Sequence, residues 1–155
     1  MTEYGPGRGP GPKPITEDDL VLILGEHRFA VLATNRPNGH PHLTTVAYTW
    51  DPDERVARIS TTADRAKVKQ LRRDPRAALH AASPDHMSFA VAEGTAELSG
   101  ISEEPGDAVG RELLAMTPGF ADPADERAFL EHMAEDRRLV IRLRATRLYG
   151  TVIAN

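Results

Sequence analysis

Hydrophobic and polar positions alternate over much of the chain in the manner of β-strands. The first such segment covers residues 29–34 and is followed by a turn, Asn35-Arg-Pro-Asn-Gly39, and by a second alternating segment at 41–50. An Asn-Gly pair between two such segments is a strong hairpin signal. Further β-like segments cover residues 55–61, 77–82, 88–98, 139–144 and 147–153, the last two forming one strand or two.

Helical signals interrupt this pattern. The first predicted helix is capped by Thr16, has acids in its first turn and stops at Gly25. A second runs from about Asp64 to Arg73, capped by Thr62 or Asp64, and ends before Pro75, which disfavours helix in the residue before it. Two more helical segments are predicted at 103–116 and 123–135, in a region rich in acidic residues.

Short strands linked by hairpins, with helices inserted between them, predict a mainly β fold with α. We expect a small barrel of about six antiparallel strands, closed or partly closed, with peripheral helices. Small residues on one face of 88–98 would let another element pack closely there. Residues 1–14 hold four Gly and four Pro, which predicts a flexible tail before one domain at 15–155.

Composition narrows the class of protein. The chain has 155 residues and no cysteine, which excludes disulfides and thiolate chemistry. We find no apolar run of about 18 residues and no signal-peptide core, so we expect a cytoplasmic protein and no membrane span. A net charge of −4, with one Trp, three Tyr and four Phe, argues against a general nucleic-acid binder.

Positive charge nevertheless gathers in one element. Six of the 19 Lys and Arg residues lie between positions 65 and 76: Arg65, Lys67, Lys69, Arg72, Arg73 and Arg76. Three hydroxyl residues precede them, Ser60, Thr61 and Thr62. Hydroxyls and free N–H groups at a helix start, followed by cations, are typical of an anion site. A solvated helix face is the alternative interpretation.

Helical geometry separates these cations. At about 100° per residue, Leu71, Val68 and Ala63 define the inward face, and Lys67 lies within about 40° of Leu71. Lys67 is therefore expected to point at the anion site, and Arg65 is close enough to the helix start to reach it. The later cations are expected on the surface or in contact with a long acidic tail: Lys69, Arg72 and Arg73.

Other candidate chemistry is sparse. His40 and His42 are two residues apart on a strand, but no third ligand has motif spacing, so no metal site is predicted. His86 lies in a turn before Ser88 and is expected to be exposed, although contact with a ligand is open. Motifs for a nucleophile elbow, a Walker loop, paired carboxylates or a dinucleotide fingerprint are absent. Enzymatic chemistry would therefore belong to a bound cofactor.

A set of short motifs, taken together, resembles a known family. They are Val31-Leu-Ala-Thr, Asn38-Gly-His-Pro, Leu43-Thr-Thr-Val, Ser60-Thr-Thr, Arg65-Ala-Lys, Leu71-Arg-Arg-Asp-Pro-Arg, Val91-Ala-Glu-Gly-Thr-Ala and Asp136-Arg-Arg. The chain resembles the split β-barrel flavin and deazaflavin oxidoreductases, relatives of pyridoxamine 5′-phosphate oxidase, from about Thr16 to Gly150. Within them it is most similar to the actinobacterial branch that uses the deazaflavin coenzyme F420.

This resemblance implies a homodimer with two cofactor sites at the interface and a hydride transfer between ring carbon C5 and an electrophilic small molecule. The implied contacts are Ser60, Thr61, Thr62, Arg65 and Lys67 for the phosphate, Thr44, Thr45 and Val46 along the ring, and Met87 and Ser88 in the same pocket. Arg138, or otherwise Arg137, would reach in from the partner. Met87 departs from the family, where an aromatic residue is expected.

Two other functions stay open at this point. FMN also offers a phosphate to such a site, so an FMN-binding oxidoreductase of the same fold is an alternative. A non-catalytic protein that holds a cofactor or another anionic planar ligand is the second. The sequence names no substrate.

Overall fold

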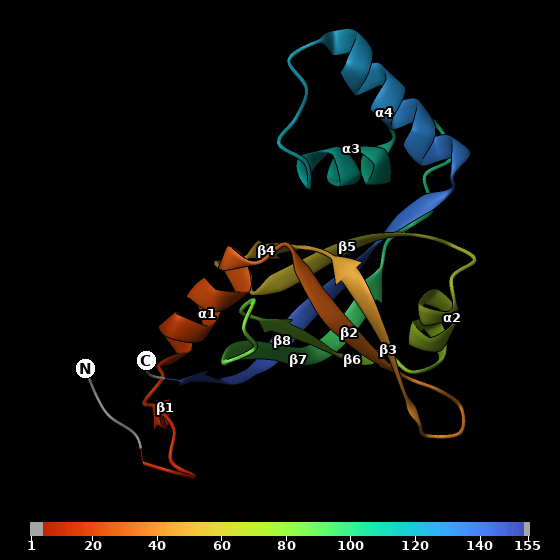
Figure 1. The fold of residues 1–155 in the computed structure, drawn as a ribbon. Coiled ribbons are helices and arrows are strands. Elements are labelled where there is room, and N and C mark those ends of the chain that lie inside the picture. Colours follow the sequence, from red (N-terminus) through yellow and green to blue (C-terminus); the bar gives the residue numbers. More distant parts are fainter. Residues whose placement is uncertain (1–4, 154–155) are drawn as a thin grey trace.

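The computed structural model describes residues 5–153 as one curled antiparallel sheet with four helices around it (Figure 1). The sheet order is β3 (Pro41–Ala47), β2 (Phe29–Asn35), β6 (Arg76–Ala82), β7 (Ser88–Leu98), β8 (Arg138–Ile153), β5 (Val56–Thr62) and β4 (Thr49–Asp51), with β1 (Pro12–Lys13) paired to β8. The helices are α1 (Glu17–Glu26), α2 (Ala66–Arg73), α3 (Ala108–Ala115) and α4 (Pro123–Glu135).

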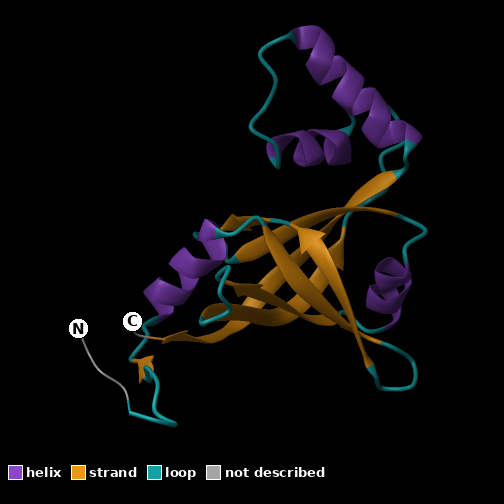
Figure 2. Cartoon of the chain, in the orientation of Figure 1, coloured by secondary structure: helices purple, strands orange, loops and turns teal. Residues whose placement is uncertain are grey.

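The predicted fold class, a split barrel with peripheral helices, is confirmed (Figure 2). The predicted count of six strands is wrong, because the sheet has eight. The segment 41–50 is interrupted at Tyr48, so that β3 and β4 end up at opposite edges of the sheet. Within the predicted tail, Pro12 and Lys13 pair with Ile153 and Val152. Residues 1–4 lie outside the described residues, and the tail and domain boundary stays a prediction.

Alternating side chains of the strands fill the barrel interior. Leu32, Leu79 and Ile141 are fully buried there, and Ile59 is 1% exposed. Burial of such side chains contributes about 1.5–3 kcal/mol each, which makes this cluster the main source of stability. The alternation of hydrophobic and polar residues along the strands therefore reflects one shared core, into which every second side chain points.

Helix α1 covers the end of this core. Its predicted cap is confirmed, since the Thr16 hydroxyl accepts a hydrogen bond from the Asp19 N–H and the Asp19 carboxylate accepts one from the Thr16 N–H. Leu24 is fully buried, and its carbonyl accepts a hydrogen bond from the Tyr48 hydroxyl. Burial raises the pKa of Tyr48 to about 12, so this phenol stays a neutral donor. The α1 end is thereby fixed to the bend between β3 and β4.

Strand β8 joins the two halves of the sheet. It pairs with β5 through residues 138–144 and with β7 through 141–152, so it is one strand and not two. A bulge between Glu93 and Gly94 adjusts the β7 register, and a Cβ at Gly94 would collide with the Arg144 carbonyl. The close approach at Gly94 is therefore made by the paired strand β8 within the sheet, and not by an element packed on the face of β7.

The helical pair α3–α4 stands away from the barrel and connects to β7 and β8 (Figure 1). The predicted bounds of α4 are confirmed, but α3 begins at Ala108 and not at Glu103. The Asp107 carboxylate accepts hydrogen bonds from the N–H groups of Glu103, Glu104 and Gly110, so it organises a turn and caps the helix. None of the described helices is long and apolar enough to cross a membrane.

Candidate functional site

A hollow of about 480 Å³ opens at the split of the barrel, between the edge strand β3, the end of β5 and the start of α2. We call it the cationic hollow. Its lining residues are Thr44, Thr45, Val46, Ala47, Ser60, Thr61, Thr62, Arg65, Lys67 and Arg138. Nine of the eleven predicted site residues therefore lie together, although they come from four separate elements.

Strand β3 forms one wall. Among the described strands it pairs only with β2, so the N–H and C=O groups on its other edge have no sheet partner. Val46 is buried and Thr45 is exposed, as expected for alternate residues of a strand. This wall can offer backbone hydrogen bonds to a planar ligand with amide-like groups.

Helix α2 forms the second wall. Its N-cap position is Arg65, and no side chain of the described residues caps it. The predicted cap was wrong because the Thr62 hydroxyl donates to the Asp64 carboxylate (2.6 Å). Free N–H groups at the start of this eight-residue helix therefore remain beside the hollow. The predicted inward face is confirmed, since Val68 is fully buried and Leu71 is 2% exposed.

The charged side chains that line the cationic hollow are positive, although two carboxylates lie just outside the lining, Asp64 beside Thr62 and Asp136 beside Arg138. Arg65, Lys67 and Arg138 line it, and its described lining includes no Asp or Glu. Lys67 is half-buried, and this burial, followed by the nearby Arg65 cation, lowers its pKa below the usual lysine value. A bound anion would raise the pKa again, because a nearby opposite charge favours the ammonium form. The site is therefore electrostatically suited to phosphate or carboxylate.

Arg138 reaches the cationic hollow from its own chain. The β5–β8 register sets it opposite Thr62, and its Nη1 donates to the Ser60 hydroxyl (3.2 Å). The family resemblance implies that Arg138 comes from a partner subunit, but in this structure Arg138 already lines the hollow of its own chain. Arg137, the other candidate, lies outside the lining and forms an ion pair with Glu103 (3.8 Å).

Met87 and Ser88 are not part of the cationic hollow. They follow the β6–β7 turn, where the Met87 N–H donates to the Asp85 carboxylate (2.9 Å) and the Met87 side chain is 40% exposed. Within one chain, these two residues and the cationic hollow therefore form separate surfaces. Their expected role at the cofactor stays a prediction.

A second, larger hollow of about 790 Å³ borders the first, and we call it the apolar hollow. The two share Ala47, Ser60 and Arg138. Its other lining residues are Gly25, His27, Arg28, Phe29, Tyr48, Thr49, Trp50, Leu113, Met116, Thr117, Pro118, Phe129 and Met133. Sequence reasoning missed it, and the available signal was the apolar set Met116, Phe129 and Met133 in the otherwise acidic 101–136 region.

Ion pairs fix the helical pair that forms one side of the apolar hollow. The Glu112 carboxylate of α3 accepts hydrogen bonds from Arg58 Nε (3.0 Å) and Arg142 Nε (2.7 Å). The Arg142 hydrogen bonds are the main reason why the pKa of Glu112 lies below its usual value. Next to this contact, Leu113 of α3 packs with Val140 of β8.

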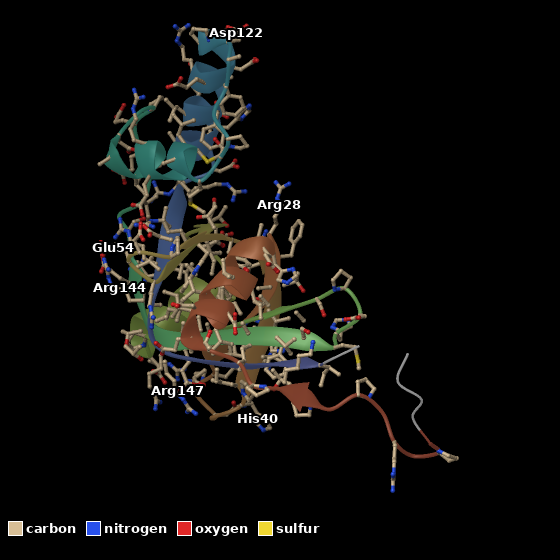
Figure 3. All side chains as sticks on the ribbon, turned by 90° about the vertical axis from the view of Figure 1, so that its left-hand side faces the viewer. Arg28, His40, Glu54, Asp122, Arg144 and Arg147 are labelled. Carbon is tan, nitrogen blue, oxygen red and sulfur yellow. The ribbon has the colours of Figure 1, made fainter. Side chains whose placement is uncertain are left out.

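The histidines do not form a metal site in the described part of the chain, which contains no suitable group of three ligands. The Gln70 side-chain carbonyl accepts hydrogen bonds from the Thr34 hydroxyl (2.5 Å) and His42 Nδ1 (2.8 Å). These contacts hold α2 against the barrel. His40 is exposed and projects outward (Figure 3), and His86 lies in the β6–β7 turn with a φ of 61°.

Residues 16–151 match the protein family described as pyridoxamine 5′-phosphate oxidase. The chain belongs to this family. The match covers every element that lines the two hollows. Family members share a scaffold, and the activity of each depends on the residues of its site.

Three known proteins are similar to this chain in sequence or in structure. An F420H(2)-dependent biliverdin reductase of Mycobacterium tuberculosis (strain CDC 1551 / Oshkosh) is 36% identical over 62 residues, 40% of this chain and 45% of that protein. The match thus spans less than half of the length of that relative. The crystal structure of conserved hypothetical protein Rv2991 from Mycobacterium tuberculosis has a TM-score of 0.70 at 26% identity, covering 90% of this chain and 86% of that one. A structure named F420 reductase has a TM-score of 0.57 at 26% identity, covering 83% and 94%.

We predict that Glu112→Gln destabilises the protein by about 1–2 kcal/mol, because Arg58 and Arg142 lose their shared carboxylate at a half-buried site. Urea unfolding measures this change, and hydrogen exchange should be faster in α3 than in the barrel strands. Glu131→Gln, on the exposed side of α4, is the matched control and should stay within about 0.5 kcal/mol of the parent. Equal stability of the two variants would contradict a stabilising role for the ion pairs of Glu112 with Arg58 and Arg142.

Proposed function

We propose that this protein is an F420-dependent oxidoreductase, which transfers a hydride between the reduced deazaflavin and an electrophilic small molecule. The observation that carries the proposal is a set of three cations, Arg65, Lys67 and Arg138, around hydroxyl groups with no lining carboxylate. Two of the similar proteins are named as F420-dependent or F420 reductases, which supports the choice of cofactor. The family match supports an oxidoreductase role.

The residues present fit such a cofactor. Its phosphate would lie between Arg65, Lys67 and the hydroxyls of β5, beside the free N–H groups of α2. Its ring would lie along Thr44–Val46, where the unpaired edge of β3 offers donors and acceptors. Lys69 and Arg72 are exposed on the outer side of α2, within reach of an oligoglutamate tail that leaves the hollow.

The bound deazaflavin would supply a hydride from C5 to an electrophilic carbon of the substrate, with a solvent proton completing the reduction. The chain's own contribution is to orient two rings and to exclude water. The apolar hollow suits that task because it borders the cationic hollow at Ala47 and Ser60. A substrate held there would lie next to the ring.

The main alternatives have direct tests. An FMN enzyme would be yellow as purified and would show a flavin spectrum, whereas we expect a colourless protein that binds F420 reversibly. A non-catalytic binding protein would bind F420 without oxidising its reduced form in the presence of quinones, enones or tetrapyrroles such as biliverdin. The expected cytoplasmic location is a further prediction that follows from this assignment.

Binding of the coenzyme tests the proposal. Titration should quench coenzyme fluorescence at micromolar concentration, and no binding in that range would overturn the choice of F420. Changing both Arg65 and Lys67 to Ala should weaken binding about 100-fold, because two charge-assisted contacts are lost. The control changes Arg36 and Arg127 to Ala, two exposed residues outside both hollows, which removes the same charge and should cost less than about fivefold. Equal losses in the two variants would indicate a general charge effect.

The pH dependence of coenzyme binding should follow Lys67. Its pKa is lowered by burial and by Arg65, so it loses its proton below the usual lysine range. Affinity should therefore be full near pH 7 and fall as pH rises toward 10, since neutral Lys67 no longer attracts the phosphate. Lys67→Arg keeps its charge and should flatten this profile. Identical profiles for the two proteins, from dissociation constants measured between pH 7 and 10, would show that Lys67 does not contact the anion.

We also propose a homodimer, in line with the family resemblance. Strands β2, β3 and β8 each expose a large apolar side chain, Phe29 (65%), Leu43 (61%) and Tyr149 (40%), and a partner subunit that packed on these strands would cover them. Sedimentation should give about twice the chain mass of 16.9 kDa. Leu43→Glu should shift the protein toward the monomer, whereas Leu22→Glu on α1, equally exposed at 64%, should not. A single-chain mass for the parent protein would contradict the proposal.

A further inference from the structure

The apolar hollow has walls that favour a flat, extended ligand. Tyr48 and Trp50 lie on the barrel side, and Phe129, Met116 and Met133 lie on the side of the helical pair. Aromatic rings stack on planar molecules, and flexible methionine side chains adapt to their outline. With a volume of about 790 Å³, the hollow is within the range of small-molecule sites.

The charged groups of the apolar hollow are of one sign. Arg28 and Arg138 line it, and none of its described lining residues is Asp or Glu. This is notable in a chain with 23 acidic and 19 basic residues. In the helical pair, Met116, Met133 and Phe129 line the hollow, and none of the acidic residues of this region does. The hollow therefore favours an apolar ligand that carries a negative charge.

Arg28 is the cation available to such a ligand. Arg138 is already engaged with Ser60 and Asp136, whereas the Arg28 side chain has no hydrogen bond or ion pair among residues 5–153. The backbone of Arg28 is held beside Tyr48, since the Arg28 carbonyl accepts a hydrogen bond from the Tyr48 N–H (3.0 Å). Figure 3 shows the Arg28 side chain projecting from the barrel on the side of the helical pair.

We propose that the apolar hollow binds the electrophilic substrate as a conjugated, ring-containing carboxylate, and that Arg28 recognises the carboxylate. This inference rests on the proposed function, because it takes the hollow as the substrate side of the same site. Conjugation suits the aromatic walls and polarises the double bond that accepts a hydride. A guanidinium recognises a carboxylate through two parallel hydrogen bonds, which selects acids over their neutral esters.

The test uses a matched pair of ligands, 3-(2-naphthyl)acrylate and its methyl ester. Binding is measured by equilibrium dialysis and by quenching of Trp50, the only tryptophan of the chain, which lines the hollow. The parent protein should bind the acid about tenfold more tightly than the ester, a difference of about 1.4 kcal/mol. Arg28→Ala should reduce acid binding to the level of the ester and leave binding of the ester and of F420 unchanged.

Arg36→Ala is the control, since Arg36 is exposed in the distant β2–β3 turn and should leave all three affinities unchanged. Equal parental affinity for acid and ester, or failure of both to bind, would overturn the assignment. A loss of F420 binding in Arg28→Ala would move Arg28 to the cofactor site and also contradict it. Acid selectivity that depends on Arg28 in a protein that does not bind F420 would support the ligand class and reject the proposed cofactor.

Discussion

The central constraint in this structure is a half-buried lysine in a hollow whose lining, among the described residues, contains two further cations and no carboxylate. Lys67 is held there because Val68 and Leu71 fix α2 against the barrel core. Desolvation and the Arg65 charge both disfavour its ammonium form. Such an arrangement costs stability in the free protein, and an anionic ligand is the partner that offsets the cost. A binding role explains this placement better than a solvated helix face does.

The split of the barrel makes the site possible. Because the chain bends at Tyr48, β3 and β4 lie at opposite edges of the sheet, and the outer edge of β3 has no partner among the strands of residues 5–153. The same bend is tied to α1 through Leu24 and carries the aromatic side of the apolar hollow. One local interruption thus creates a polar edge for a cofactor ring and an apolar surface beside it.

The sequence predicted a barrel with peripheral helices and the α4 bounds, because alternation and capping are local signals. The place of Thr44–Val46 and Arg138 beside the basic helix came from the family resemblance and not from a local pattern. The sequence did not predict the start of α2, where the Thr62 hydroxyl bonds to Asp64 instead of capping the helix. The apolar hollow was also missed. Its lining comes from α1, the β2–β4 region and the helical pair, and only tertiary packing brings Trp50 and Met133 to the same hollow. Local sequence patterns do not show which distant residues meet in the fold.

The decisive measurement is a crystal structure of the protein with F420 bound. We expect the cofactor phosphate within hydrogen-bond distance of Arg65 and Lys67, with the ring along β3 and its reactive face open to the apolar hollow. A phosphate bound elsewhere, with these two side chains directed into solvent, would contradict this expectation.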